Sequence, residues 1–164
     1  MTIAYLALGA NLGDRAAAID DATRRLAAIE GVTLVARSPV YETDPVGGPP
    51  GQEPYLNLVV AIESDASARQ LLGMCHRIES AAGRVRGERW GPRTLDIDIL
   101  LWGDLVRDDA QLTIPHPRLH ERAFVVLPLL DLDAHPVLPD GRRLLEQSAP
   151  RGEARPVGPP LAMP

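Results

Sequence analysis

Residues 94–102 have the sequence TLDIDILLW, in which aliphatic and acidic side chains alternate. This alternation is typical of a β-strand, because successive side chains of a strand point to opposite faces of the sheet. The expected buried face consists of four aliphatic residues, namely Leu95, Ile97, Ile99 and Leu101. Asp96 and Asp98 should then lie together on the opposite face.

The segments before this strand complete a regular order of elements. Strands are expected at residues 3–9, 32–43 and 55–63, and helices at residues 14–30 and 67–82. The second helix opens with Ser67 and has Gln70 three residues later, which is a capping-box pattern. The order predicts an α+β chain with a ferredoxin-like βαββαβ antiparallel sheet whose helices cover one face. A C-terminal hairpin and a short helical extension should follow.

The length of 164 residues is typical of one domain with a buried core, which we place at residues 1–148. The remaining segment, residues 149–164, contains five prolines, and we expect it to be a disordered, dispensable tail. Residues 44–54 contain four prolines and three glycines. This loop is too long for a hairpin turn and is a candidate lid over a binding site.

Composition narrows the functional classes. The chain is 45% hydrophobic, and its longest apolar run, residues 124–130, is interrupted by Pro128, so we expect no membrane span. All seventeen basic residues are arginine, and the absence of lysine excludes a Walker-A phosphate loop and a lysine nucleophile. The chain has a single cysteine, Cys75, and no basic residue in residues 1–14. Both features favour a cytoplasmic location. The net charge of −5 argues against general nucleic-acid binding.

Positive charge is concentrated in one short segment. Residues 84–93 contain four arginines and one glutamate, which gives a net charge of +3 directly before the acidic strand. Two carboxylates on one face repel each other unless a cation lies between them, and magnesium prefers oxygen ligands of this kind. The arginines either form ion pairs with Asp96 and Asp98 or bind the same polyphosphate as a metal held by them. A solvated surface pair is the alternative for the aspartates taken alone.

Other polar residues are candidates for ligand contacts. Tyr55 and Asn57 share one face of their predicted strand, and an aromatic ring beside a carboxamide can hold a flat heterocycle, unless both are plain surface residues. His116 lies between two prolines, which indicates a positioned side chain with either a structural or a functional role. The glycine-containing segment at residues 9–13 lacks the GxGxxG spacing, so we interpret it as a turn.

Five motifs resemble those of the hydroxymethyl-dihydropterin pyrophosphokinases. The longest is RWGPRTLDIDI at residues 89–99. The others are LGANLGD at residues 8–14, YETDP at residues 41–45, YLN at residues 55–57, and IPHPR at residues 114–118 followed by Arg122 and Phe124. The resemblance runs from residue 3 to about residue 132, which is most of the chain.

This resemblance implies a folate-pathway enzyme in which the hydroxymethyl oxygen of 6-hydroxymethyl-7,8-dihydropterin attacks the β-phosphorus of ATP, and AMP leaves. It implies ATP as co-substrate and two Mg²⁺ ions bound by Asp96 and Asp98, with Arg84 and Arg93 as catalytic arginines. The family's nucleotide-binding positions fall on Glu79, Arg86, Arg89, Trp90, Arg93, Ile99, Thr113, His116 and Arg122. Its pterin-binding positions fall on Thr43, Pro45, Val46, Tyr55, Asn57, Trp90 and Phe124. His76 and Gln111 depart from residues that members often have, which leaves fine nucleotide contacts open.

Two other functions compete with this interpretation. One is a different magnesium-dependent phosphotransferase or phosphohydrolase that uses the same aspartates. The other is a noncatalytic ferredoxin-like module that binds RNA or a regulatory ligand. An aromatic content of 4% and a negative net charge disfavour the RNA module. We expect a monomer that binds small molecules and neither nucleic acid nor membranes.

Overall fold

The computed structural model describes residues 2–44, 50–83, 95–147 and 153–157. The main sheet contains β1 (Thr2–Ala10), β2 (Val32–Arg37), β3 (Tyr41–Thr43), β4 (Tyr55–Ser64), β5 (Asp96–Trp102) and β8 (Arg155–Pro156). The helices are α1 (Arg15–Ala27), α2 (Ala68–Ala81), α3 (Ala123–Leu132) and α4 (Leu144–Gln147). A separate hairpin pairs β6 (Arg107–Asp108) with β7 (Thr113–Ile114). The predicted α+β class is confirmed.

All neighbouring strands of the main sheet are antiparallel, in the order β5, β1, β4, β3 and β8. The two halves of β4 pair with different strands, because β2 lies beside residues 60–64 and β3 beside residues 55–57. The sequence predicted one continuous strand at residues 32–43. Pro39 interrupts that strand, since proline has no N–H for the ladder. Ser38 keeps the connection to β4, where its hydroxyl accepts a hydrogen bond of 2.9 Å from Val59 N.

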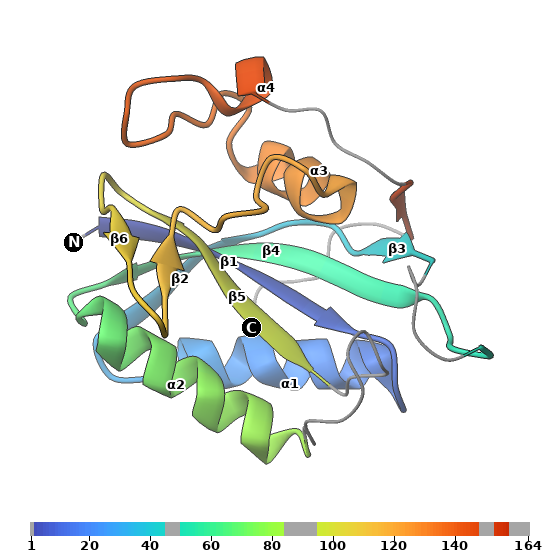
Figure 1. The fold of residues 1–164 in the computed structure, drawn as a ribbon. Coiled ribbons are helices and arrows are strands. Elements are labelled where there is room, and N and C mark those ends of the chain that lie inside the picture. Colours follow the sequence, from blue (N-terminus) through green and yellow to red (C-terminus); the bar gives the residue numbers. More distant parts are fainter. Residues whose placement is uncertain (1, 45–49, 84–94, 148–152, 158–164) are drawn as a thin grey trace.

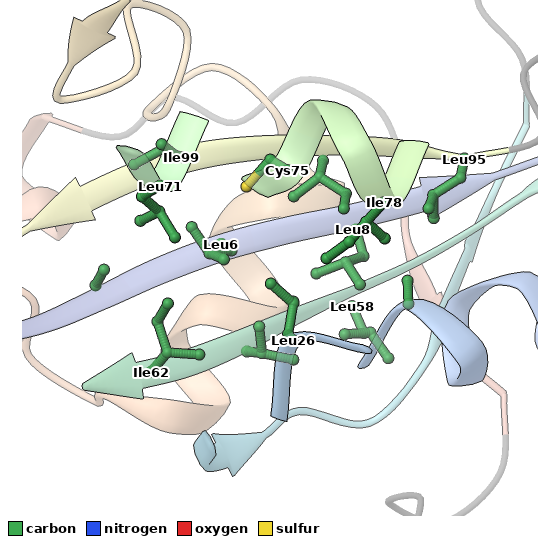
Figure 2. Packing of buried hydrophobic residues seen from close by; sticks show 14 of the residues in the cluster. Leu6, Leu8, Leu26, Leu58, Ile62, Leu71, Cys75, Ile78, Leu95 and Ile99 are labelled. Atoms are coloured by element: carbon green, nitrogen blue, oxygen red, sulfur yellow. The ribbon is translucent and has the colours of Figure 1, made fainter. Parts of the chain in front are cut away.

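One face of the sheet packs against α1 and α2 (Figure 1). Both helices begin at the predicted caps, and the capping box between Ser67 and Gln70 is present. Figure 2 shows the core that they close, with Leu6, Leu8, Leu58 and Ile62 from the sheet, Leu26 from α1, and Leu71, Cys75 and Ile78 from α2. Each fully buried aliphatic side chain of this kind stabilises the fold by about 1.5–3 kcal/mol. This core therefore fixes the plane of the sheet.

The opposite face carries α3, which is the expected helical extension (Figure 1). A second apolar cluster joins Val59 of β4 and Leu100 of β5 to Val125 and Leu129 of α3. The sequence placed α3 as a short helical extension but gave no face for it, because its apolar residues surround the helix. Within the described ranges, no helix is long and apolar enough to cross a membrane.

A β-bulge corrects one face assignment in β5. Tyr5 pairs with Leu101 and Leu6 pairs with Ile99, so Leu100 is an extra residue without a partner in the register. Beyond such a bulge the alternation of side chains is reversed. Leu101 therefore lies in the second cluster, whereas the sequence placed it on the α1/α2 face. Leu95, Ile97 and Ile99 lie on that face as predicted.

Residues 153–157 are the described part of the segment that was expected to be disordered, and they contain a short strand. Arg155 and Pro156 form β8, which pairs with β3 at the edge of the sheet (Figure 1). The N–H of Val157 donates a further hydrogen bond of 2.9 Å to Val40 O. Sequence periodicity could not predict this strand, because two residues are too few to show a pattern and the pairing partner is distant in the chain.

Candidate active site

The aspartates of β5 lie on the sheet face that α3 partly covers. Ile97 and Ile99 point into the first core, so Asp96 and Asp98 point to the opposite side, and both are half-buried. In the sheet register Asp96 pairs with Gly9 of β1, and Gly9 pairs with Asn57 of β4. This row across three strands therefore places Asp96, a predicted metal ligand, and Asn57, a predicted pterin-binding residue, on one face of the sheet.

Gly9 forms the floor of this row. A Cβ atom added at Gly9 would lie 2.7 Å from Asn57 Oδ1, which is closer than non-bonded atoms approach. Glycine at this position therefore lets Asn57 Oδ1 approach the backbone of β1 without displacing the side chain. In the sequence Gly9 ends an expected strand and begins a turn, and neither assignment predicts this role.

Asn57 is held in place from the next strand. Its side chain is only 6% exposed, and Nδ2 donates a hydrogen bond of 3.0 Å to Thr43 Oγ1 of β3. Tyr55 pairs with Thr43 in the register and is half-buried. Three predicted pterin-binding residues, Thr43, Tyr55 and Asn57, are thus brought together on the expected face.

His116 and Arg122 lie near the aspartates, although both follow β5 by more than ten residues. The N–H of His116 donates a hydrogen bond of 2.9 Å to Leu100 O, which fixes this loop against β5. Burial lowers the pKa of His116, the positive charge of Arg122 lowers it further, and Asp96 acts in the opposite direction. The imidazole is therefore neutral at neutral pH, and its Nδ1 accepts a hydrogen bond of 3.2 Å from Arg118 N.

Arg122 is the N-cap residue of α3 and is half-buried. Burial lowers the pKa of its guanidinium, as does the charge of Arg118, while Asp98 and Asp96 raise it. The guanidinium carbon lies 5.5 Å from the centre of the Phe124 ring, within the range of a cation–π interaction. Arg122 thus brings positive charge to the aspartates and is linked to the predicted pterin-stacking ring.

Three other predicted nucleotide-binding residues have partners within the protein. Glu79 is only 4% exposed, and its Oε2 accepts a hydrogen bond of 3.1 Å from Ile97 N, between the two aspartates. The side chain of Ile99 is buried in the first core. The hydroxyl of Thr113 donates to Asp108 Oδ1 across the small hairpin at 3.5 Å. No pattern in the sequence predicted the contact between Glu79 and β5.

The turn after β1 and the start of α1 contact the end of the candidate lid loop at residues 44–54. Asn11 Nδ2 donates to Gln52 Oε1 at 3.0 Å, and Arg15 Nη1 donates to Pro54 O at 2.6 Å. The remaining predicted site residues lie outside the described residues. They are Pro45, Val46, Arg84, Arg86, Arg89, Trp90 and Arg93.

The donor set fits a metal bound together with a nucleotide. Across the described ranges, no three His, Cys, Asp or Glu side chains form a group that could hold a metal ion by themselves. Magnesium commonly takes one or two carboxylates from the protein and completes its octahedral shell with water and substrate phosphates. Asp96 and Asp98 match this mode of binding.

Comparison with known proteins shows the family of the chain. The family model of 7,8-dihydro-6-hydroxymethylpterin-pyrophosphokinase (HPPK) matches residues 5–134. The chain belongs to this family. Family membership makes the chain an enzyme and decides against a noncatalytic binding module.

Curated relatives of the HPPK family cover most of the chain. The 2-amino-4-hydroxy-6-hydroxymethyldihydropteridine pyrophosphokinase of Methylorubrum extorquens is 46% identical over 132 residues, which are 80% of this chain and 83% of that protein. The protein of the same name from Haemophilus influenzae is 40% identical over 146 residues, which are 89% and 91% of the two chains.

The fold also resembles that of solved HPPK structures. The crystal structure of wild-type Plasmodium falciparum HPPK-DHPS aligns with a TM-score of 0.58 at 16% identity. The alignment covers 80% of this chain and 40% of the longer chain in that structure. This likeness supports the arrangement of the sheet and helices.

Proposed function

We propose that the sheet face formed by Asp96, Asp98, Gly9 and Asn57 is where this chain carries out the reaction of its family. That reaction transfers a pyrophosphoryl group from ATP to the hydroxymethyl group of 6-hydroxymethyl-7,8-dihydropterin and releases AMP, in folate biosynthesis. The observation that supports the location is the continuous row from the acidic pair to the buried carboxamide. A row of this kind places two substrates side by side.

The acidic end of the row is the proposed triphosphate site. Asp96 and Asp98 would hold two Mg²⁺ ions, which when bound neutralise charge on the phosphate oxygens and on the transferring group. Arg122 adds a guanidinium next to the same carboxylates, and neutral His116 can donate or accept a hydrogen bond without adding charge. The remaining nucleotide contacts proposed from the resemblance are Glu79, Arg86, Arg89, Trp90, Arg93, Ile99 and Thr113.

The carboxamide end of the row is the proposed pterin site. Asn57 and Thr43 present hydrogen-bonding groups to the edge of a heterocycle, and Tyr55 and Phe124 are aromatic rings that can stack on its faces. Contacts from Pro45, Val46 and Trp90 are proposed from the resemblance alone. The low exposure of Asn57 restricts which edge of a ligand can reach it.

The reaction requires positioning more than a strong base. As the hydroxymethyl oxygen forms a bond to the β-phosphorus, the bond between that phosphorus and the oxygen bridging to the α-phosphorus breaks. AMP leaves with the bridging oxygen, and the hydroxyl proton is released to solvent. The described residues contribute by holding the two substrates in line and by meeting negative charge with Arg122. Arg84 and Arg93 are proposed to meet the charge that develops in the transition state.

The finer features of the molecule are also proposals. The spatial order of β5, β1, β4 and the β2/β3 pair corresponds to the fourth, first, third and second strands of a βαββαβ unit, which supports a ferredoxin-like fold. We propose a cytoplasmic monomer with its catalytic unit at residues 1–148, ATP and the pterin as its ligands, and no nucleic-acid or membrane partner.

Removal of one carboxylate tests the proposed metal site. Asp98→Asn should lower turnover by about 10³-fold or more, because the metal loses a charged ligand while the shape of the side chain is kept. Isothermal titration calorimetry with a magnesium-bound, non-hydrolysable ATP analogue should also show a loss of affinity. Asp104→Asn, in the exposed turn after β5, is the matched control and should leave both values unchanged. Near-normal turnover of Asp98→Asn would remove the metal assignment.

A further inference from the structure

The described part of the C-terminal tail lies against the strand that carries Thr43. β3 pairs with β4 on one side, and β8 pairs with its other side, where Glu42 lies opposite Arg155 and Tyr41 opposite Pro156. The hydrogen bond from Val157 N to Val40 O, at 2.9 Å, extends this pairing. Without β8, the three residues of β3 would form the edge of the sheet. A three-residue edge strand has few bonds to hold it in register.

Arg155 adds charge contacts to the backbone pairing. Its Nη2 lies 2.9 Å from Glu42 Oε1 and 3.2 Å from Asp44 Oδ1. Glu42 and Asp44 are the residues on either side of Thr43, and both contacts raise the pKa of Arg155. One guanidinium therefore bridges the two carboxylates that flank Thr43. Those carboxylates would otherwise repel each other at this end of β3.

We infer that residues 153–157 support the proposed pterin site. In this role Arg155 is a positioning residue that acts on Thr43 and Asn57. The contacts run from Arg155 to Glu42 and Asp44, from them along the backbone to Thr43, and from Thr43 Oγ1 to Asn57 Nδ2. This inference rests on the proposed pterin site. It concerns a segment beyond residue 134, where the match to the family ends.

The geometry limits the effect to one substrate. β3 and β8 lie at one edge of the sheet, whereas Asp96 and Asp98 lie on β5 at the opposite edge, with β1 and β4 in between. A loosened β3 changes the position of Thr43 and Asn57 but leaves the acidic pair in place. The tail should therefore affect pterin binding and leave nucleotide binding unchanged.

Two truncations and three point variants of the full-length chain test this inference. One truncation ends the chain at residue 152 and removes β8, and the matched control ends it at residue 157 and keeps β8. The point variants are Arg155→Glu, the conservative Arg155→Lys, and Arg142→Glu. Arg142 is the control because it is an exposed arginine that contacts Asp140 in a loop outside the sheet.

The measured quantities are the Kd for the pterin, from its fluorescence, the Kd for a magnesium-bound ATP analogue, and the urea midpoint of unfolding. The truncation at 152 and Arg155→Glu should weaken pterin binding by about 3- to 10-fold, which is the range expected for loss of two exposed ion pairs and a short strand. Arg155→Lys should recover most of this loss, because an ammonium can still bridge the two carboxylates. Nucleotide affinity and the unfolding midpoint should stay the same in all five variants.

Unchanged pterin affinity after truncation at 152 would overturn the inference. A parallel loss of pterin affinity, nucleotide affinity and stability would also overturn it, because the tail would then be a general structural element. Failure of the wild-type chain to bind the pterin would instead overturn the proposed pterin site, and this inference with it. Hydrogen exchange gives a separate readout, since amides at residues 40–44 should exchange faster in the chain that ends at 152 than in the chain that ends at 157.

Discussion

Gly9 shows how a residue without a side chain can shape the site. Its backbone lies beneath the Asn57 carboxamide, at a distance that leaves no space for a Cβ atom. The strand pairing fixes Gly9 from both sides, so β1 cannot move away to make space. The Asn57 side chain would have to give way instead, and its hydrogen bond to Thr43 would be lost.

Gly9→Ala should therefore raise the KM for the pterin by about 10-fold, the equivalent of one lost hydrogen bond, with little change in the KM for ATP. Steady-state kinetics with each substrate varied in turn measures both values. Gly73→Ala is the matched control, because a Cβ atom at this position in α2 meets only Arg77 Nη1 at 3.7 Å. That control should keep full activity and gain up to about 1 kcal/mol of stability. An equal rise in both KM values for Gly9→Ala would contradict the assignment.

His116 predicts a pH dependence of stability. Its pKa is lower in the folded chain than its usual value, chiefly because of burial, so the unfolded chain binds this proton more tightly. The contribution of His116 is therefore fully present above about pH 6.5 and is lost as the pH falls through its folded pKa. The free energy of unfolding should fall less between pH 7.5 and 5.5 in His116→Gln than in the wild type. Identical pH profiles for the two chains would show that His116 is not the group responsible.

At the scale of elements, β5 is held by contacts from both of its sides. β1 pairs with one edge, and the buried carboxylate of Glu79 in α2 accepts a hydrogen bond from Ile97 N on the other. Ile97 separates Asp96 from Asp98. The contact thus fixes the backbone from which both proposed metal ligands extend.

Glu79→Ala should destabilise the fold by about 1–3 kcal/mol, because the N–H of Ile97 loses its buried acceptor. Glu79→Gln keeps an acceptor of the same length and should recover part of this loss. Urea unfolding followed by circular dichroism gives the comparison. Glu30→Ala, at an exposed position after α1, should be neutral. A Glu79→Ala chain as stable as the wild type would show that the hydrogen bond to β5 contributes nothing.

Local patterns predicted most element boundaries but not the irregularities inside elements. The caps of α1 and α2 and the faces of Asp96 and Asp98 follow from short-range rules that need only neighbouring residues. The extra residue at Leu100 does not, because a bulge depends on the register with β1 rather than on the sequence of β5. Pro39 was visible in the sequence, but the hydroxyl of Ser38 that compensates for it finds its partner only in the folded sheet.

At the scale of the whole molecule, the sheet has two different faces. α1 and α2 pack on one face to form the main core, while α3 packs on part of the face that carries Asp96, Asp98 and Asn57. The sequence predicted an open face but not which part of it α3 would cover. A helix with apolar residues on all sides carries no information about its orientation.

The strand β8 is the clearest case of structure that the sequence could not predict. Residues 149–164 are rich in proline, which normally indicates disorder, yet Arg155 and Pro156 extend the sheet. Pro156 is compatible with this place because β8 is an edge strand, where a missing N–H costs little. The decisive contacts, from Arg155 to Glu42 and Asp44, join residues more than 110 positions apart.

The identity of the nucleotide product tests the proposed pyrophosphoryl transfer most directly. The wild-type chain, ATP and 6-hydroxymethyl-7,8-dihydropterin should together release AMP and form the pterin diphosphate in equal amounts, and EDTA should abolish both. In the variant that carries both Asp96→Asn and Asp98→Asn, AMP release should fall to the background level with the fold intact. Release of ADP or free phosphate, or AMP release that persists in this double variant, would contradict a pyrophosphoryl transfer organised by the acidic pair.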